Sequence, residues 1–172
     1  MTVATPVVFY EYAATDDKWQ PHNAVDNNRT GKNVVSHRLS LMTWNIWYEP
    51  VEDKLRFQGI LNQIYRVTQE VDVIALQEVT PRFLAALQSN QYIQQHWLIT
   101  DRWDDAHQKV LRDNGYGVMF LVNRALEINI EAWIAPFPTS KTGRYAQLLE
   151  MKTDDLNLVI FHYPDFIDER HD

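Results

Sequence analysis

The sequence predicts an α/β layered fold with antiparallel strand pairs. The first half of the chain has the order strand, helix, strand, helix, and the second half has several strand patterns in succession. That order favours a layered fold over a doubly wound parallel sheet. With 172 residues and 45% hydrophobic content, the chain has enough apolar mass for one globular domain with a buried core.

Seven segments rich in β-branched and aromatic residues have the pattern of strands. They are residues 7–12, 38–45, 71–76, 116–122, 126–135, 145–152 and 156–162. Turn signals separate the last four, including Asn114-Gly115, Thr142-Gly143 and Asp154-Asp155. Residues 1–38 are predicted to be an amino-terminal extension, and residues 39–172 the main domain. Within the extension, Trp19 and Pro21 favour packing over a mobile tail.

Two helices are predicted between the early strands. Residues 55–67 carry apolar side chains close to helical spacing, namely Leu55, Ile60, Leu61, Ile64 and Val67. Pro81 stands at the start of a second helix with Phe83, Leu84 and Leu87 on one face. Residues 92–99 follow as the end of a helix or as a strand.

Composition and charge exclude several classes of function. The net charge of −7 gives no global basic field, so any contact with nucleic acid must be local. An acidic protein that acts on phosphates is expected to use a divalent cation. The chain has no Cys, which excludes disulfides, thiolate zinc sites and Cys nucleophiles. We see no signal peptide and no membrane span, and we expect a cytoplasmic protein without membrane contact.

Two predicted strands end on a polar side chain that follows a run of apolar, core-forming residues. Asn45 follows Leu-Met-Thr-Trp, and Glu78 follows Val-Ile-Ala-Leu-Gln. Strand ends are where α/β sheets present side chains to ligands. Glu78 suits a hard cation that binds substrate phosphate, and Asn45 can hold a phosphate oxygen or orient a carboxylate. The alternatives are a Glu that stabilises a helix start and a turn Asn.

Other candidates lie beside Asn45 and farther along the chain. Trp44, Trp47 and Tyr48 flank Asn45 and could stack on a base or an aromatic leaving group, although at least two of them are expected in the core. His162 ends a strand and could donate to a phosphoryl oxygen or transfer a proton, or it could be a structural His. The loop of residues 138–144, with Lys141 and Arg144, suits phosphate contact or is a solvated hairpin.

Several short segments occur in an order that is typical of one family. They are Thr-Trp-Asn-Ile from Thr43, Leu-Gln-Glu-Val from Leu76, Tyr-Gly-Val-Met-Phe-Leu-Val from Tyr116, Pro-Phe-Pro-Thr-Ser-Lys from Pro136, and Phe161-His162. From about residue 39 onwards, the chain thereby resembles the endonuclease/exonuclease/phosphatase superfamily, and within it the tyrosyl-DNA phosphodiesterase branch. The resemblance implies a DNase I-like sandwich of two packed sheets with helices outside, and hydrolysis of phosphoesters with Mg²⁺ or Mn²⁺.

The resemblance also implies roles for individual residues. Asn45, Glu78 and His162 would be catalytic, with Glu78 and Asn45 at the metal, and Trp47, Lys141 and Arg144 would bind substrate. His162 matches the His of the family's His-Leu-Glu-Ser segment, but Tyr163 and Pro164 follow it here. Residues 163–172 match neither the Asp-x-Asn nor the closing Ser-Asp-His segment of the family.

From those unmatched segments we expect the amino-terminal part of a longer enzyme, weak or inactive as these 172 residues. We also expect one sheet to lack the sheet it packs on, leaving an apolar face for self-association. The leading function is a phosphodiesterase for nucleic-acid ends or protein–DNA adducts, as in DNA repair. The alternatives are a noncatalytic binding or scaffold protein of the same fold, and a phosphatase of small or lipid phosphoesters.

Overall fold

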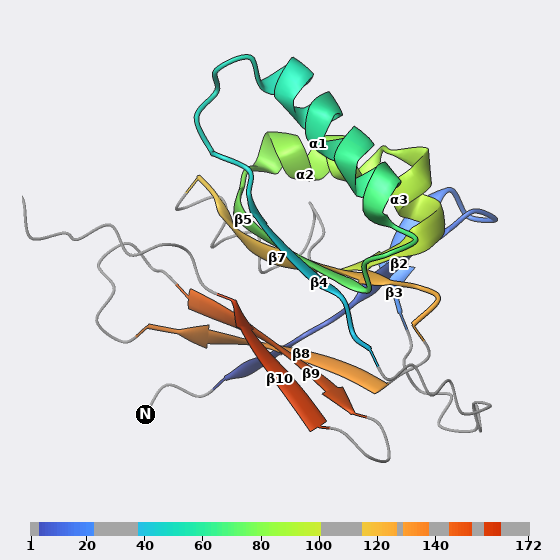
Figure 1. The fold of residues 1–172 in the computed structure, drawn as a ribbon, viewed down its shortest axis with the longest axis vertical. Coiled ribbons are helices and arrows are strands. Elements are labelled where there is room, and N and C mark those ends of the chain that lie inside the picture. The colour runs from blue at the N-terminus through green and yellow to red at the C-terminus, as the bar shows by residue number, and fades with distance from the viewer. Residues whose placement is uncertain are drawn as a thin grey trace, which may run out of the picture.

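The computed structural model describes residues 4–22, 38–100, 115–126, 129–137, 145–152 and 157–162. Two sheets pack face to face, and the helices cover the outer face of the larger one (Figure 1). Within the described residues, the larger sheet has six strands in the order β3-β2-β6-β7-β5-β4. The smaller sheet has four, in the order β1-β8-β9-β10. The α/β sandwich that the sequence predicts is confirmed.

The elements alternate early in the chain and become consecutive strands later. The strands are β1 (Thr5–Val7), β2 (Tyr10–Ala13), β3 (Lys18–Pro21), β4 (Leu41–Asn45), β5 (Val73–Val79), β6 (Trp97–Ile99), β7 (Gly117–Asn123), β8 (Asn129–Pro136), β9 (Tyr145–Lys152) and β10 (Asn157–His162). The helices are α1 (Asp53–Val67), α2 (Pro81–Gln88) and α3 (Gln91–His96). None of the described helices is long and apolar enough to cross a membrane.

Apolar spacing marks the buried face of α1, and a capping side chain marks the start of α2. In α1, Phe57, Ile60 and Ile64 share one face and are buried against the larger sheet. Leu55 was expected on that face but is 70% exposed, because it lies on the opposite side of the helix. The Thr80 hydroxyl accepts a hydrogen bond from the Phe83 backbone N–H at 3.2 Å, which fixes the start of α2.

Two apolar layers hold the sandwich together. One lies between the helices and the larger sheet, and the other lies between the two sheets. The central strand β7 serves both layers, with Met119 and Leu121 facing the helices and Val118 and Phe120 facing the smaller sheet. The expectation that one sheet lacks its partner is therefore wrong, because β8 to β10 and β1 supply it. Self-association stays a prediction.

The amino-terminal segment contributes to both sheets. Residues 7–12 were predicted to be one strand, but the chain crosses between the sheets at Val8 and Phe9. β1 pairs with β8 in the smaller sheet, and β2 pairs with β3 and β6 in the larger one. Trp19 packs as expected, since its indole N–H donates to the Gln88 carbonyl oxygen at 3.1 Å.

Candidate metal and phosphate site

The candidate site lies where β4 and β5 end side by side. These two strands pair in parallel, and Asn45 stands opposite Gln77 in their register. Parallel strands bring their carboxyl ends to the same edge of a sheet. The Asn45 side-chain amide accordingly donates a hydrogen bond to Glu78 Oε1 at 2.9 Å. The structure thus brings together the two residues that we singled out at the strand ends.

A β-bulge in β5 presents Glu78 to the open edge. The pairing of β5 with β7 shifts register between Leu76 and Val79. Without that shift, strict alternation would place Glu78 on the helix-facing side with Leu76, whereas Val79 takes the core position instead. Glu78 has a φ of 56°, a left-handed conformation that is strained for a non-glycine residue. Strain of this kind gathers at functional sites.

The Glu78 carboxylate is held by hydrogen bonds from the strand next to it and from the loop that follows. Its Oε1 accepts from Asn45, and its Oε2 accepts from the Tyr48 backbone N–H at 2.9 Å. Asn45 Oδ1 in turn accepts from the Trp47 backbone N–H at 2.9 Å. The carboxylate is therefore oriented before any ligand arrives, which lowers the entropic cost of binding.

Arg56 on α1 fixes the loop after β4, and we found no signal for this role in the sequence. Its guanidinium donates to the backbone carbonyl oxygens of Trp47 at 3.0 Å, Glu49 at 2.6 Å and also Val51. It also lies over the Trp47 ring, 5.1 Å from the centroid. One side chain thus ties the first turns of α1 to the loop that supplies the Tyr48 N–H.

Replacing Arg56 by Lys should loosen this loop, because an ammonium cannot span three carbonyl groups as a planar guanidinium does. Losing charge-assisted hydrogen bonds should speed hydrogen exchange at the Tyr48 amide by about tenfold or more. Arg66→Lys on the same helix is the matched control and should leave that rate unchanged. Equal exchange rates in both variants would show that Arg56 does not hold the loop.

His162 lies at the end of β10, in the layer between the sheets. It is 4% exposed, and its ring packs against Phe120 at a centroid distance of 5.1 Å. Its Nε2 is 2.6 Å from the side-chain nitrogen of Gln77, the neighbour of Glu78 in β5. Burial lowers the pKa of His162 to about 4. The ring is therefore uncharged near neutral pH, where the sequence had suggested proton transfer.

This burial should make stability depend on pH. Between pH 6.5 and about 4, the unfolded chain binds a proton at His162 and the folded protein does not, so lowering the pH destabilises the fold. The slope from this one group should approach roughly 1.4 kcal/mol per pH unit. Urea midpoints measured across this range should fall more steeply for the wild type than for His162→Gln. Parallel curves would contradict the buried, neutral state.

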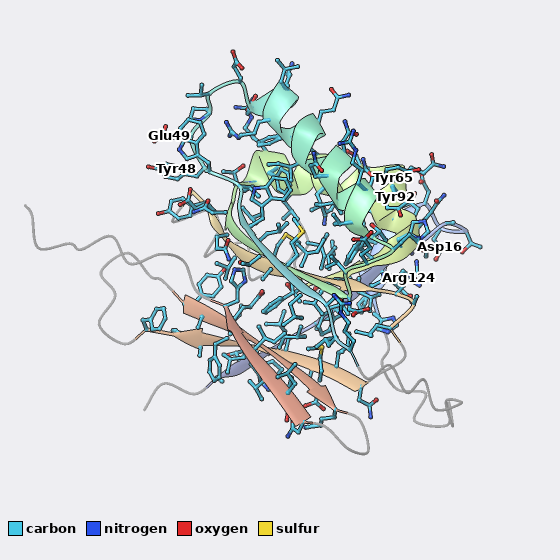
Figure 2. All side chains as sticks on the ribbon, viewed as in Figure 1. Asp16, Tyr48, Glu49, Tyr65, Tyr92 and Arg124 are labelled. Carbon is cyan, nitrogen blue, oxygen red and sulfur yellow. The ribbon has the colours of Figure 1, made fainter. Side chains whose placement is uncertain are left out.

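Aromatic side chains beside the site are more exposed than the sequence suggested. Trp44 packs against the core, but Trp47 is 49% exposed and Tyr48 is 40% exposed. The expectation that two of these three are core residues is therefore wrong. Tyr48 stacks on Tyr116 with ring centroids 4.6 Å apart, and Figure 2 shows Tyr48 and Glu49 projecting from the loop after β4. Lys141 and Arg144 lie outside the described residues.

The donor set at this edge suits a cation that keeps most of its water. The described residues contain no group of three or more His, Cys, Asp or Glu side chains that could enclose a metal ion. One carboxylate with a neighbouring amide is enough for Mg²⁺, which usually keeps several waters and shares its other positions with substrate phosphate. Glu78 and Asn45 fit that manner of binding, and they do not fit a closed structural site.

Comparisons with known proteins agree with this architecture. Solved structures of similar fold include D. rerio TDP2 complexed with single-strand DNA product, with a TM-score of 0.59 and 19% identity, covering 76% of this chain and 48% of that one. TDP2 from C. elegans has a TM-score of 0.55 and 21% identity, covering 73% of this chain and 35% of that one. At such identities the likeness shows the fold. This chain spans less than half of these TDP2 chains.

No curated protein matches the chain. The model of the Endonuclease/Exonuclease/phosphatase family, however, matches residues 42–164. That range includes Asn45 and Glu78 at the ends of β4 and β5, and it contains β5 to β10 in full. On this match and on the sandwich of two sheets, the chain belongs to the endonuclease/exonuclease/phosphatase family.

Proposed function

We propose that this protein is a divalent-metal-dependent phosphodiesterase that acts on nucleic-acid ends or protein–DNA adducts. The observation that supports it most is the Glu78 carboxylate, which a bulge presents at the sheet edge and which Asn45 and the Tyr48 N–H orient. Families of this fold hydrolyse phosphoesters, and the chain carries the residue that such chemistry needs first, an oriented carboxylate at the sheet edge.

Glu78 would be the metal ligand in this proposal. An ionised carboxylate has about four lone-pair sites, so the two hydrogen bonds that it accepts leave capacity for a cation. Mg²⁺ or Mn²⁺, when bound there, would polarise the phosphoryl oxygens. Asn45 would keep the carboxylate in position through its amide N–H, while its Oδ1 is held by Trp47. His162 would meet the phosphate as a neutral hydrogen-bonding group.

The exposed rings favour a substrate with an aromatic group beside the phosphate. Trp47 and Tyr48 lie two and three residues after Asn45 and are exposed, and stacking of a base on such a ring is worth roughly 1–3 kcal/mol. Lys141 and Arg144 would add charge-assisted contacts to phosphate. The TDP2 structure with a single-strand DNA product supports nucleic acid as the substrate class. These features favour a nucleotide or tyrosyl ester over a lipid or a small phosphoester.

The alternative is a protein that binds the same ligands without hydrolysis. It is favoured by the sparse donor set, since the described residues offer no enclosed cluster of acidic or His side chains around Glu78. A catalytic site needs a positioned water and charge stabilisation in addition to a metal. Binding alone requires only the oriented carboxylate and the aromatic rings.

Hydrolysis of a 5′-phosphotyrosyl oligonucleotide by the native gene product tests the proposal. We expect release of the 5′-phosphorylated strand with Mg²⁺ or Mn²⁺, and none after chelation by EDTA. Binding of the oligonucleotide with the metal but without product would favour the noncatalytic alternative. Product formation that survives EDTA would contradict the role proposed for the metal.

A further inference from the structure

A polar link crosses between the two sheets directly beside the candidate site. Gln77 precedes Glu78 in β5, and its side-chain nitrogen lies 2.7 Å from Thr43 Oγ1 and 2.6 Å from His162 Nε2. Thr43 belongs to β4 in the larger sheet, and His162 belongs to β10 in the smaller one. One amide thus connects β4, which ends at Asn45, the strand of Glu78 and the edge strand that carries His162.

The chemistry of the amide decides which nitrogen of His162 carries the proton. A glutamine NH₂ group has two N–H donors and accepts nothing. Here one donor points to the Thr43 hydroxyl oxygen and the other to His162 Nε2, so that Nε2 must accept. In a neutral imidazole the proton then sits on Nδ1, because the hydrogen bond at one ring nitrogen fixes the other.

The second ring nitrogen has no partner in the described part of the structure. His162 Nδ1 is buried, and no described group hydrogen-bonds to it. A buried donor without an acceptor costs free energy, so this N–H is suited to any acceptor oxygen that reaches it. A second link crosses between the sheets nearby, from Thr100 Oγ1 to Gln147 Oε1 at 3.2 Å, and Gln147 is the register neighbour of His162.

We propose that Gln77 is a positioning residue that holds the His162 ring in the tautomer protonated on Nδ1. Under the proposed function, on which this part rests, that arrangement keeps a neutral N–H donor on the ring for a phosphoryl oxygen. Gln77 touches no reacting atom and acts through His162. It also couples the strand that presents the metal ligand to the edge strand of the opposite sheet.

The nitrogen chemical shifts of the His162 ring test the tautomer without any assay of activity. In ¹⁵N-labelled wild-type protein at neutral pH, we expect a protonated Nδ1 and an unprotonated Nε2, with the signals assigned by their loss in His162→Gln. Gln77→Glu should move the proton to Nε2, because a carboxylate accepts and does not donate. Gln77→Leu should remove the preference for Nδ1.

Two further variants control for general damage. Thr43→Val removes the other acceptor of the amide and should leave the proton on Nδ1. If Gln77→Leu does not fold, Gln77→Glu carries the test. Gln94→Leu deletes a glutamine of α3 that bonds the Gln88 carbonyl oxygen and should change nothing at His162. A proton on Nε2 in the wild type, or a tautomer unchanged in both Gln77 variants, would overturn the proposal.

Kinetics separate this proposal from the function on which it rests. If the protein hydrolyses phosphodiesters, Gln77→Leu should lower kcat by roughly 10–100-fold, the usual cost of losing a group that orients another, with KM little changed. A loss confined to KM would overturn the positioning role. If the ¹⁵N chemical shifts of His162 are as expected but the protein hydrolyses no phosphodiester, the result supports the role of Gln77 in fixing the tautomer. It then counts against the proposed function alone.

Discussion

Replacing Glu78 by Gln is expected to lower phosphodiester hydrolysis by about 100-fold or more. The neutral amide keeps the size of the side chain but removes the charge that would hold the cation, and a bound cation supplies several kcal/mol of transition-state stabilisation. The loss should appear in kcat/KM for a 5′-phosphotyrosyl oligonucleotide at saturating Mg²⁺.

Glu52→Gln is the matched control for this prediction. Glu52 lies at the start of α1, carries the same charge as Glu78, and its side chain caps nothing there. It should retain the wild-type rate. Comparable losses in Glu78→Gln and Glu52→Gln would mean that the net charge of the region matters, and that Glu78 has no special role.

Replacing Phe83 by Ala should lower the free energy of unfolding by about 3–5 kcal/mol. Phe83 is fully buried in the layer between the helices and the larger sheet, where its ring meets Phe57 edge to face at 5.1 Å. Removing the ring leaves a cavity that the surrounding strands and helices cannot fill. Urea denaturation monitored by tryptophan fluorescence measures the change.

Leu55→Ala provides the comparison, because Leu55 is 70% exposed on α1. Its loss should change stability by less than about 0.5 kcal/mol, as is usual for surface positions. A small effect of Phe83→Ala, similar to that of Leu55→Ala, would contradict the packing of α2 against the sheet.

Much of the fold follows from local patterns in the sequence. β9 spans the predicted residues 145–152, and β7 differs from its prediction by one residue at each end. In β7 the signal is a continuous apolar run, which marks a strand that is buried on both faces. Residues 7–12 form a similar run, yet they divide between two sheets. Which sheet a short strand joins depends on contacts with β8 and β6, which are distant in the sequence.

The site could be predicted in outline but not in its geometry. Strand-end position was enough to select Asn45 and Glu78, since β4 and β5 are parallel neighbours. The bulge that turns Glu78 outwards depends on its pairing with β7, and nothing local encodes it. The contacts of Gln77 likewise join segments that meet only in the fold. Those of Arg56 are close in sequence but depend on the path of the loop after β4, which no local pattern predicts.

Titration with Mn²⁺, followed by calorimetry, tests most directly whether Glu78 forms a divalent cation site. The wild type and Glu52→Gln should bind Mn²⁺ with the same affinity, and Glu78→Gln should show no binding at the same concentrations. A wild-type protein that binds no Mn²⁺, or a Glu78→Gln protein that binds it as tightly as the wild type, would contradict the assignment.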